Sequence, residues 1–261
     1  MELTMLESFF IHHSAFNRKY NSSLQQNSEE IWSFSIHRTI NYIDNINTPS
    51  LSIYLGHTLQ QYYPKGIPRY HNLYHALCVA STARELVRNT RGTFTDEECR
   101  RESKIAFLAG LFHDAGYSLQ VTDAENVKRA SEIFTDIATQ EGPLKIFLLR
   151  SKISISDITD VILCTQFDKE TQSFPVEPTS KAALAVRDAD LLGFMDPYWP
   201  ALMAGLAIEM GINPMDCAQI KSMLTKQLAF LEKKKPYIDI GWTHNAREAY
   251  FLGLRKIIEE I

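Results

Sequence analysis

Glycine and proline are both scarce in this chain of 261 residues, which contains 11 glycines and 10 prolines. Each makes up about 4% of the chain, against a typical usage of roughly 7% for glycine and 5% for proline. An all-β protein of this length would need more of these residues in its turns. The shortage therefore argues against a sandwich or barrel and favours a helical protein, and the hydrophobic pattern is helical almost throughout.

Three further features are missing, and each excludes a class of protein. No apolar run approaches the roughly 18 residues that a membrane span needs, and the N-terminal residues lack the basic start of a signal peptide. The four cysteines form no Cys-x-x-Cys pair, so neither a zinc knuckle nor a disulfide framework is indicated. The formal net charge of -4 argues against a protein that coats nucleic acid. We therefore expect a cytoplasmic protein that acts on neither membranes nor nucleic-acid polymers.

The hydrophobic pattern predicts an all-α protein of about ten helices, organised as a single domain over residues 1–261. Residues 1–64 are predicted to form an N-terminal helical extension. The tract 64–68, which reads Pro-Lys-Gly-Ile-Pro, is the clearest break in the pattern. Residues 65–212 are predicted to form the core of the domain, and residues 213–261 its C-terminal helices.

Capping signals place two of the predicted helices. Thr95 with Glu98, and Thr122 with Glu125, have the spacing of capping boxes, which satisfy backbone N–H groups in the first turn of a helix. The stretch 105–112 is apolar on every face, so its helix is expected at the centre of the bundle.

Other helix boundaries rest on single residues. Ser156 is predicted to be an N-cap, Pro214 is predicted to occupy a first helical position, and Gly142-Pro143 is predicted to stop the preceding helix. The tract Phe174–Pro178 is predicted to be a loop. The predicted helical segments are 29–45, 48–63, 72–89, 95–116, 122–140, 156–167, 179–194, 197–210, 214–235 and 243–260.

Two clusters of potential metal ligands contain histidine. His71 and His75 are four residues apart, so one helical turn would project both imidazoles from the same face. His113 and Asp114 follow directly on the long apolar stretch. A buried His-Asp pair is costly unless a partner satisfies it, and a divalent cation is one such partner.

A third cluster places Asp188 and Asp190 within another apolar helix. One cation bound by two imidazoles and two carboxylates would tie three helices together and leave positions open for water and substrate. Mixed nitrogen and oxygen ligands suit Mn, Fe, Co, Ni or Zn, and suit Mg less well. Such an ion would lower the pKa of a bound water and polarise a phosphoryl oxygen.

The order of these motifs resembles that of the HD superfamily of metal-dependent phosphohydrolases. The chain has Arg69-Tyr70-His71-Asn72 with His75, then Phe112-His113-Asp114 with Tyr117, then Glu125-Asn126, and then Asp188-Ala189-Asp190-Leu191. The similarity covers roughly residues 66–212. It is closest to predicted bacterial HD phosphohydrolases, which are related to the cyclic-nucleotide phosphodiesterases, and it implies an HD-type helical bundle.

The resemblance also implies a role for each site residue. The implied ligands of one divalent metal ion are His75, His113, Asp114 and Asp190. His71 would protonate the leaving group, and Glu125 would orient or deprotonate the attacking water, although Glu125 is explained equally well by its capping box. Arg69 and Asp188 are expected to contact the substrate, and Asp188 is also the alternative to Asp190 as the ligand.

Two departures from the family pattern favour a single metal ion. The dinuclear phosphodiesterases carry further histidines after the His-Asp pair, whereas no histidine follows Asp114 closely here. The bacterial relatives carry a histidine where this chain has Gln166, and Asp168 nearby is only a weak substitute ligand.

We therefore expect this protein to hydrolyse a small phosphate ester, with a nucleotide or cyclic nucleotide as the favoured substrate. We expect it to act as a monomer or homodimer. The alternative is a catalytically weak or inactive HD-fold module that binds a ligand or partner and keeps a structural metal. A di-iron oxygenase of the same fold ranks last, because it needs more histidines.

Overall fold

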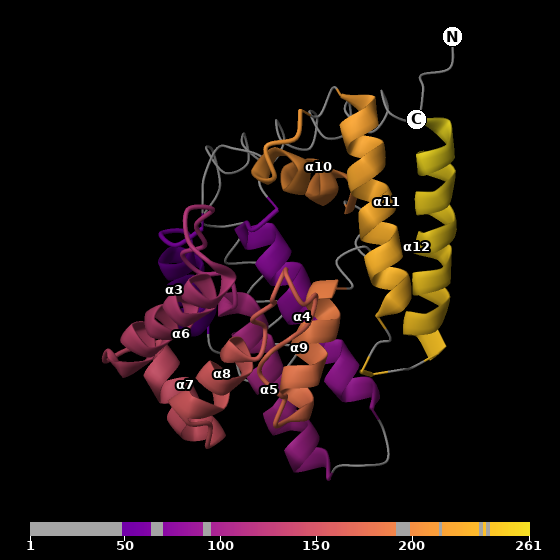
Figure 1. Cartoon of the computed structure of the whole chain (residues 1–261). Coiled ribbons are helices and arrows are strands. Elements are labelled where there is room, and N and C mark those ends of the chain that lie inside the picture. The colour runs from indigo at the N-terminus through magenta and orange to yellow at the C-terminus, as the bar shows by residue number, and fades with distance from the viewer. Residues whose placement is uncertain are drawn as a thin grey trace. The chain divides into compact units, whose positions relative to one another are not determined.

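The computed structural model describes residues 49–63, 70–90, 95–191, 199–213, 216–234, 237–238 and 241–261. The predicted helix over 29–45 and the break at 64–68 lie outside these residues. The described part of the chain forms ten α-helices, and its only β-pairing is an isolated bridge between Asp168 and Ser173 (Figure 1). The predicted all-α class is confirmed. None of the described helices is long and apolar enough to cross a membrane.

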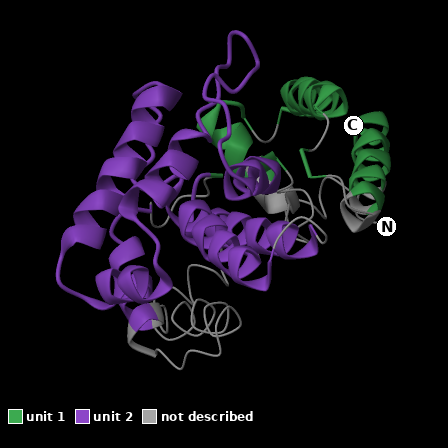
Figure 2. Cartoon of the chain, turned by 90° about the horizontal axis from the view of Figure 1, so that it is seen from below, with its two compact units in different colours: residues 1–26, 66–70, 191–261 green, residues 27–65, 71–190 purple. Residues whose placement is uncertain are grey.

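The chain divides into two compact units, which are coloured separately in Figure 2. The larger unit consists of residues 27–65 and 71–190, and the smaller one of residues 1–26, 66–70 and 191–261. The helices of the larger unit are α3 (Pro49–Leu59), α4 (Leu73–Asn89), α5 (Asp96–Phe112), α6 (Asp123–Thr139), α7 (Pro143–Ser151), α8 (Ile155–Leu163) and α9 (Lys181–Leu191), the last residue of which belongs to the smaller unit. The helices of the smaller unit are α10 (Trp199–Glu209), α11 (Cys217–Lys233) and α12 (Gly241–Glu260). The predicted single domain, with its boundaries after residues 64 and 212, stays a prediction.

Helices α4 and α5 form the centre of the larger unit. The apolar stretch from Ile105 to Phe112 is buried throughout, which confirms the prediction that this helix is central. The two helices cross closely at Gly110, where an added Cβ would lie 2.8 Å from the Cα of Ala80. Helix α8 packs against α5 and α6, and α3 packs against α7. The C-terminal end of α5 therefore lies at a well-packed position.

Both predicted capping boxes are present. The Thr95 side chain accepts a hydrogen bond from the Glu98 N–H at the start of α5, and Glu98 bonds back to the Thr95 N–H. Thr122 and Glu125 form the same pair of bonds at the start of α6. These motifs involve residues three apart, so the sequence alone was enough to locate them.

Three helix starts differ from the predictions. Helix α8 is capped by Ser154 rather than Ser156, because Asp157 completes a capping box with Ser154. Helix α11 begins at Cys217 behind the N-cap Asp216, so the prediction that Pro214 begins it is wrong. Pro143 follows the end of α6 and also occupies the first turn of α7, a helix that is absent from the predicted segments.

Candidate metal centre

The N-terminal turn of α4 fixes His75 inside the larger unit. Asn72 is the N-cap, and its side-chain Oδ1 accepts a hydrogen bond from the His75 N–H at 2.9 Å. This bond satisfies one of the backbone donors that a helix start leaves open. The His75 side chain is fully buried, and its ring centroid lies 5.3 Å from that of His113.

The C-terminal end of α5 supplies His113 and Asp114. The Nδ1 of His113 lies 2.8 Å from the carbonyl oxygen of Gly110, one turn earlier. A ring nitrogen that donates to a backbone carbonyl leaves the other nitrogen as the acceptor, which is the usual arrangement of a histidine ligand. The Nε2 of His113 is thereby available toward Asp114, whose Oδ2 lies 2.9 Å away.

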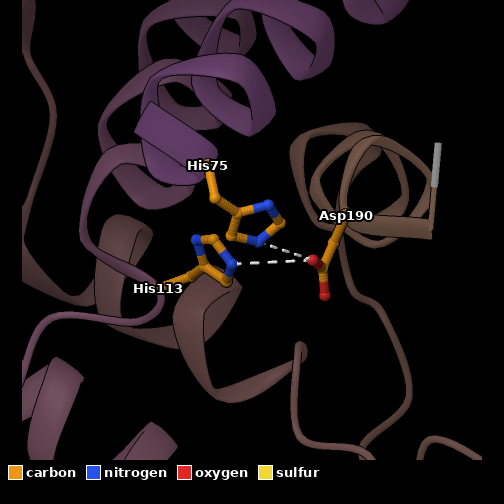
Figure 3. A group of neighbouring side chains, drawn as sticks. All are labelled: His75, His113 and Asp190. Carbon is orange, nitrogen blue, oxygen red and sulfur yellow. Dashed lines mark ion pairs between the residues drawn. The ribbon is translucent and has the colours of Figure 1, made fainter. Parts of the chain in front are cut away.

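Helix α9 brings Asp190 to the same place. Its Oδ1 lies 3.1 Å from the Nε2 of His75 and 3.8 Å from the Nε2 of His113. Figure 3 shows the two imidazoles and this carboxylate facing one another. Asp188 is two residues earlier, about 200° away around a helix, and is only 2% exposed. Of the two carboxylates, Asp190 is therefore the one that meets the histidines.

The separations of these atoms suit one metal ion. Donor atoms about 2.1 Å from an ion lie about 3.0 Å apart at right angles, and about 3.4 Å apart in a tetrahedron. The donor atoms of His75, His113 and Asp190 all lie within 4.8 Å of one another. Asp114 Oδ2 adds a fourth donor atom, 3.4 Å from the Nε2 of His75.

The burial of polar atoms supports the same fit. The Nε2 of His113 and the Oδ2 of Asp114 are buried and have no correctly oriented hydrogen-bond partner, although they lie close together. Buried polar atoms without such partners are costly, and a cation would satisfy both. The imidazole and carboxylate donors present fit a divalent transition metal.

The charges of the cluster are strongly coupled. Burial alone would lower the pKa of both imidazoles, but the close carboxylates of Asp114 and Asp190 raise the pKa of His75 and raise that of His113 well above its ordinary value. Burial alone would raise the pKa of each carboxyl, but the facing imidazoles hold the pKa of Asp114 and of Asp190 below the ordinary range. A cation binding here would replace protons, because ligating imidazoles must be neutral.

His71 lies beside this cluster, immediately before the N-cap of α4. Its ring stacks on the ring of Tyr117, with the centroids 3.6 Å apart and the planes 11° apart. It meets the His75 ring edge-on, with the centroids 6.2 Å apart. His71 is half-buried, whereas His75 is fully buried. The structure thus brings the predicted proton donor next to the predicted ligands.

The remaining predicted site residues are placed differently. Glu125 is exposed, and its carboxylate accepts hydrogen bonds from the N–H and the hydroxyl of Thr122, both at 2.8 Å. These bonds lower the pKa of Glu125. Asp168 Oδ1 accepts a bond from the N–H of Glu170 at 2.8 Å within its own turn. Arg69 lies outside the described residues. The expected roles of Glu125, of Asp188 and of Arg69 stay predictions.

Asp123, which is not among the predicted site residues, lies near enough to the metal centre to feel the charges of Asp114 and Asp190. Its Oδ2 accepts a hydrogen bond from the N–H of Phe167 at 2.7 Å, which joins the start of α6 to the loop after α8. Burial raises the pKa of Asp123 against the opposite effect of that bond, and the negative charges of Asp114 and Asp190 raise it further. An acidic residue in a first helical turn is common for dipole reasons alone, so the sequence carries no signal that singles out Asp123.

Comparison with known proteins agrees with this geometry. The family model of the HD domain matches residues 72–195, from the N-cap of α4 to just beyond α9. The match contains all four implied ligands, and it is narrower than the resemblance over residues 66–212. A search of curated proteins finds no match. HD domains are typically metal-dependent hydrolases. The part of this chain from residue 72 to residue 195 is an HD domain.

Proposed function

We propose that this chain is a metal-dependent phosphohydrolase that cleaves a small phosphate ester, with a nucleotide or cyclic nucleotide as the favoured substrate. The observation that carries the proposal is the convergence of the His75, His113 and Asp190 donor atoms within 4.8 Å. Asp114 lies against both imidazoles. Among the described residues this is the one group of such side chains, which favours a single ion.

Part of this cluster faces solvent, as a substrate site requires. The Asp190 side chain is 30% exposed, whereas the two histidines are at most 2% exposed. A divalent cation held here supplies two things: it acidifies a bound water, and it stabilises the charge on phosphoryl oxygens. The surrounding protein holds the ligands in place before substrate arrives, which lowers the reorganisation that catalysis requires.

The chain's own residues supply the proton transfers. His71 is assigned the donation of a proton to the leaving oxygen, which is supported by its position beside the His75 ring and by its stacking on Tyr117, which holds the plane of its ring. Asp123 is assigned the orientation of the attacking water, because its half-buried carboxylate is held by the Phe167 N–H and is near enough to Asp114 and Asp190 for their charges to raise its pKa. Substrate recognition is assigned to Arg69 and Asp188, and the chain is proposed to act in the cytoplasm as a monomer or homodimer.

The first experiment joins elemental analysis to a substrate screen. The purified full chain is expected to contain one divalent metal ion and to hydrolyse at least one member of a panel of nucleoside monophosphates, cyclic nucleotides and simple phosphate esters. His71→Ala is expected to lower kcat by about 10²- to 10⁴-fold without loss of metal, because His71 is not among the ligands. The exposed His244 on α12 supplies the matched control, His244→Ala.

Two results would contradict the proposal. One is a chain that binds no divalent ion and shows no hydrolysis with Mn, Fe, Co, Ni, Zn or Mg. The other is a metal-loaded chain that binds ligands but hydrolyses none, which would establish the inactive binding module with a structural metal.

A second pair of variants separates Asp123 from Glu125. Asp123→Asn is expected to lower kcat by about 10-fold or more, because the amide cannot act as an acceptor of the water proton. Glu125→Gln is expected to leave kcat within about two-fold, since glutamine preserves the capping box. Steady-state kinetics on the best substrate of the screen measure both. A large loss in Glu125→Gln together with an active Asp123→Asn would assign the role to Glu125 instead.

A further inference from the structure

Tyr63, just after α3, reaches the end of the helix that carries the His-Asp pair. Its side chain is 4% exposed, and its hydroxyl donates a hydrogen bond to the carbonyl oxygen of Leu111 at 2.8 Å. The two residues are 48 positions apart in the chain. Tyr63 precedes the matched segment 72–195, so this contact comes from outside the HD domain.

The Leu111 carbonyl is available because α5 changes its hydrogen-bond pattern there. In a continuing α-helix the N–H of Ala115 would bond to the carbonyl of Leu111. It bonds instead to the carbonyl of Phe112, at 2.9 Å. A buried carbonyl at a helix end must be satisfied by another donor. The Tyr63 hydroxyl is that donor, two residues before the ligand His113.

The other end of the same turn is held by the neighbouring residue. The N–H of Gly116 bonds to the carbonyl of Tyr62 at 2.9 Å. Gly116 has a φ of 74°, a left-handed conformation that favours glycine. Its own carbonyl accepts a hydrogen bond from Nη1 of Arg129 on α6, at 3.0 Å.

These contacts fix the segment that carries the site. Residues 62–63 hold residues 111 and 116, and between them lie His113 and Asp114. Tyr117 follows directly, and its ring stacks on His71. Residues 62–63, which precede the HD domain, therefore position both the ligand pair His113-Asp114 and the Tyr117 ring that stacks on His71.

We propose that Tyr63 is a positioning residue for the metal centre, whose hydroxyl holds the His113-Asp114 turn in the geometry that binds metal. The proposal rests on the metal site of the proposed function, but it concerns a residue whose hydroxyl bonds to the Leu111 carbonyl and which is not one of the four implied ligands. Groups that orient metal ligands from behind typically contribute about 10- to 100-fold in metal affinity.

The test compares Tyr63→Phe with Tyr62→Phe in the full chain. Both variants remove one phenolic hydroxyl, but Tyr62 uses its backbone carbonyl, which the substitution leaves intact. Titration of the metal-free protein with Co²⁺ is expected to give about 10- to 100-fold weaker binding in Tyr63→Phe, with a changed visible absorption spectrum. Tyr62→Phe is expected to bind within about two-fold of the unmodified chain, with the same spectrum.

A second variant and a rescue experiment distinguish a local effect on metal binding from a general failure of the variant to fold. Arg129→Met removes the half-buried partner of the Gly116 carbonyl, so we expect it also to weaken Co²⁺ binding. Replacement of Tyr63 by 4-aminophenylalanine restores a donor and is expected to recover most of the affinity. Unchanged affinity and spectrum in both Tyr63→Phe and Arg129→Met would overturn the inference. An unmodified chain that binds no Co²⁺ would instead overturn the proposed function.

Discussion

Substitution of Asp190 by Asn is expected to remove the stabilisation that a divalent metal gives to this protein. A ligand present at 100 times its Kd stabilises the folded state by about 2.7 kcal/mol. For a chain of this size each kcal/mol corresponds to roughly 2–4 °C in Tm, so the unmodified chain should gain about 5–10 °C. Asp190→Asn should show almost none of this gain, because its loss weakens binding by more than about 100-fold.

Asp188→Asn is the matched control, because it removes the other carboxylate of the same helix. Asp188 is buried, so its loss is expected to lower the Tm of the metal-free protein. It should nevertheless leave the metal-induced gain in Tm intact. Differential scanning calorimetry with and without saturating metal measures that gain. The reverse pattern, with the gain lost only in Asp188→Asn, would show that the ligand is Asp188.

Substitution of Gly110 by Ala is expected to cost about 3 kcal/mol of unfolding free energy. The new Cβ would lie 2.8 Å from Ala80 Cα, 2.9 Å from Ala80 N and 3.2 Å from the carbonyl carbon of Val79. These are backbone atoms of α4, so no rotamer change can relieve the contact and the two central helices must separate. A loss of this size corresponds to roughly 6–12 °C in Tm.

The same substitution is expected to disturb the metal centre, because the Gly110 carbonyl faces Nδ1 of His113. Gly253→Ala is the control, since no described atom beyond its chain neighbours and the backbone of its own helix lies within 4 Å of the position where its Cβ would be built. It lies within α12, so alanine there should stabilise by about 0.5–1 kcal/mol. Urea unfolding at pH 7 measures both changes. A Gly110→Ala variant within about 0.5 kcal/mol of the unmodified chain would contradict the close helix crossing.

Local sequence signals predicted much of the fold. Thr95 with Glu98 and Thr122 with Glu125 form capping boxes because the paired residues are only three positions apart. The central position of the 105–112 stretch followed from its composition. Single-residue signals were weaker: Ser154 rather than Ser156 caps α8, because the nearby Asp157 decides which serine completes the box.

The same distinction between sequence signals and tertiary packing applies to the candidate metal centre. The resemblance to the HD phosphohydrolases implied His75, His113, Asp114 and Asp190 as ligands, and it left Asp188 as the alternative to Asp190. The tertiary structure placed Asp190 rather than Asp188 against the histidines, since only packing determines how a helix is rotated about its axis.

The supporting residues came from the tertiary structure alone. The bond from Tyr63 to Leu111 spans 48 positions, and that from Phe167 to Asp123 spans 44. Neither pair has a spacing that a helical or turn pattern can indicate. The sequence by itself determined an all-α chain with ligands of the HD type. Only the folded chain decided which neighbours hold those ligands, because hydrogen bonds between distant segments depend on how the helices pack.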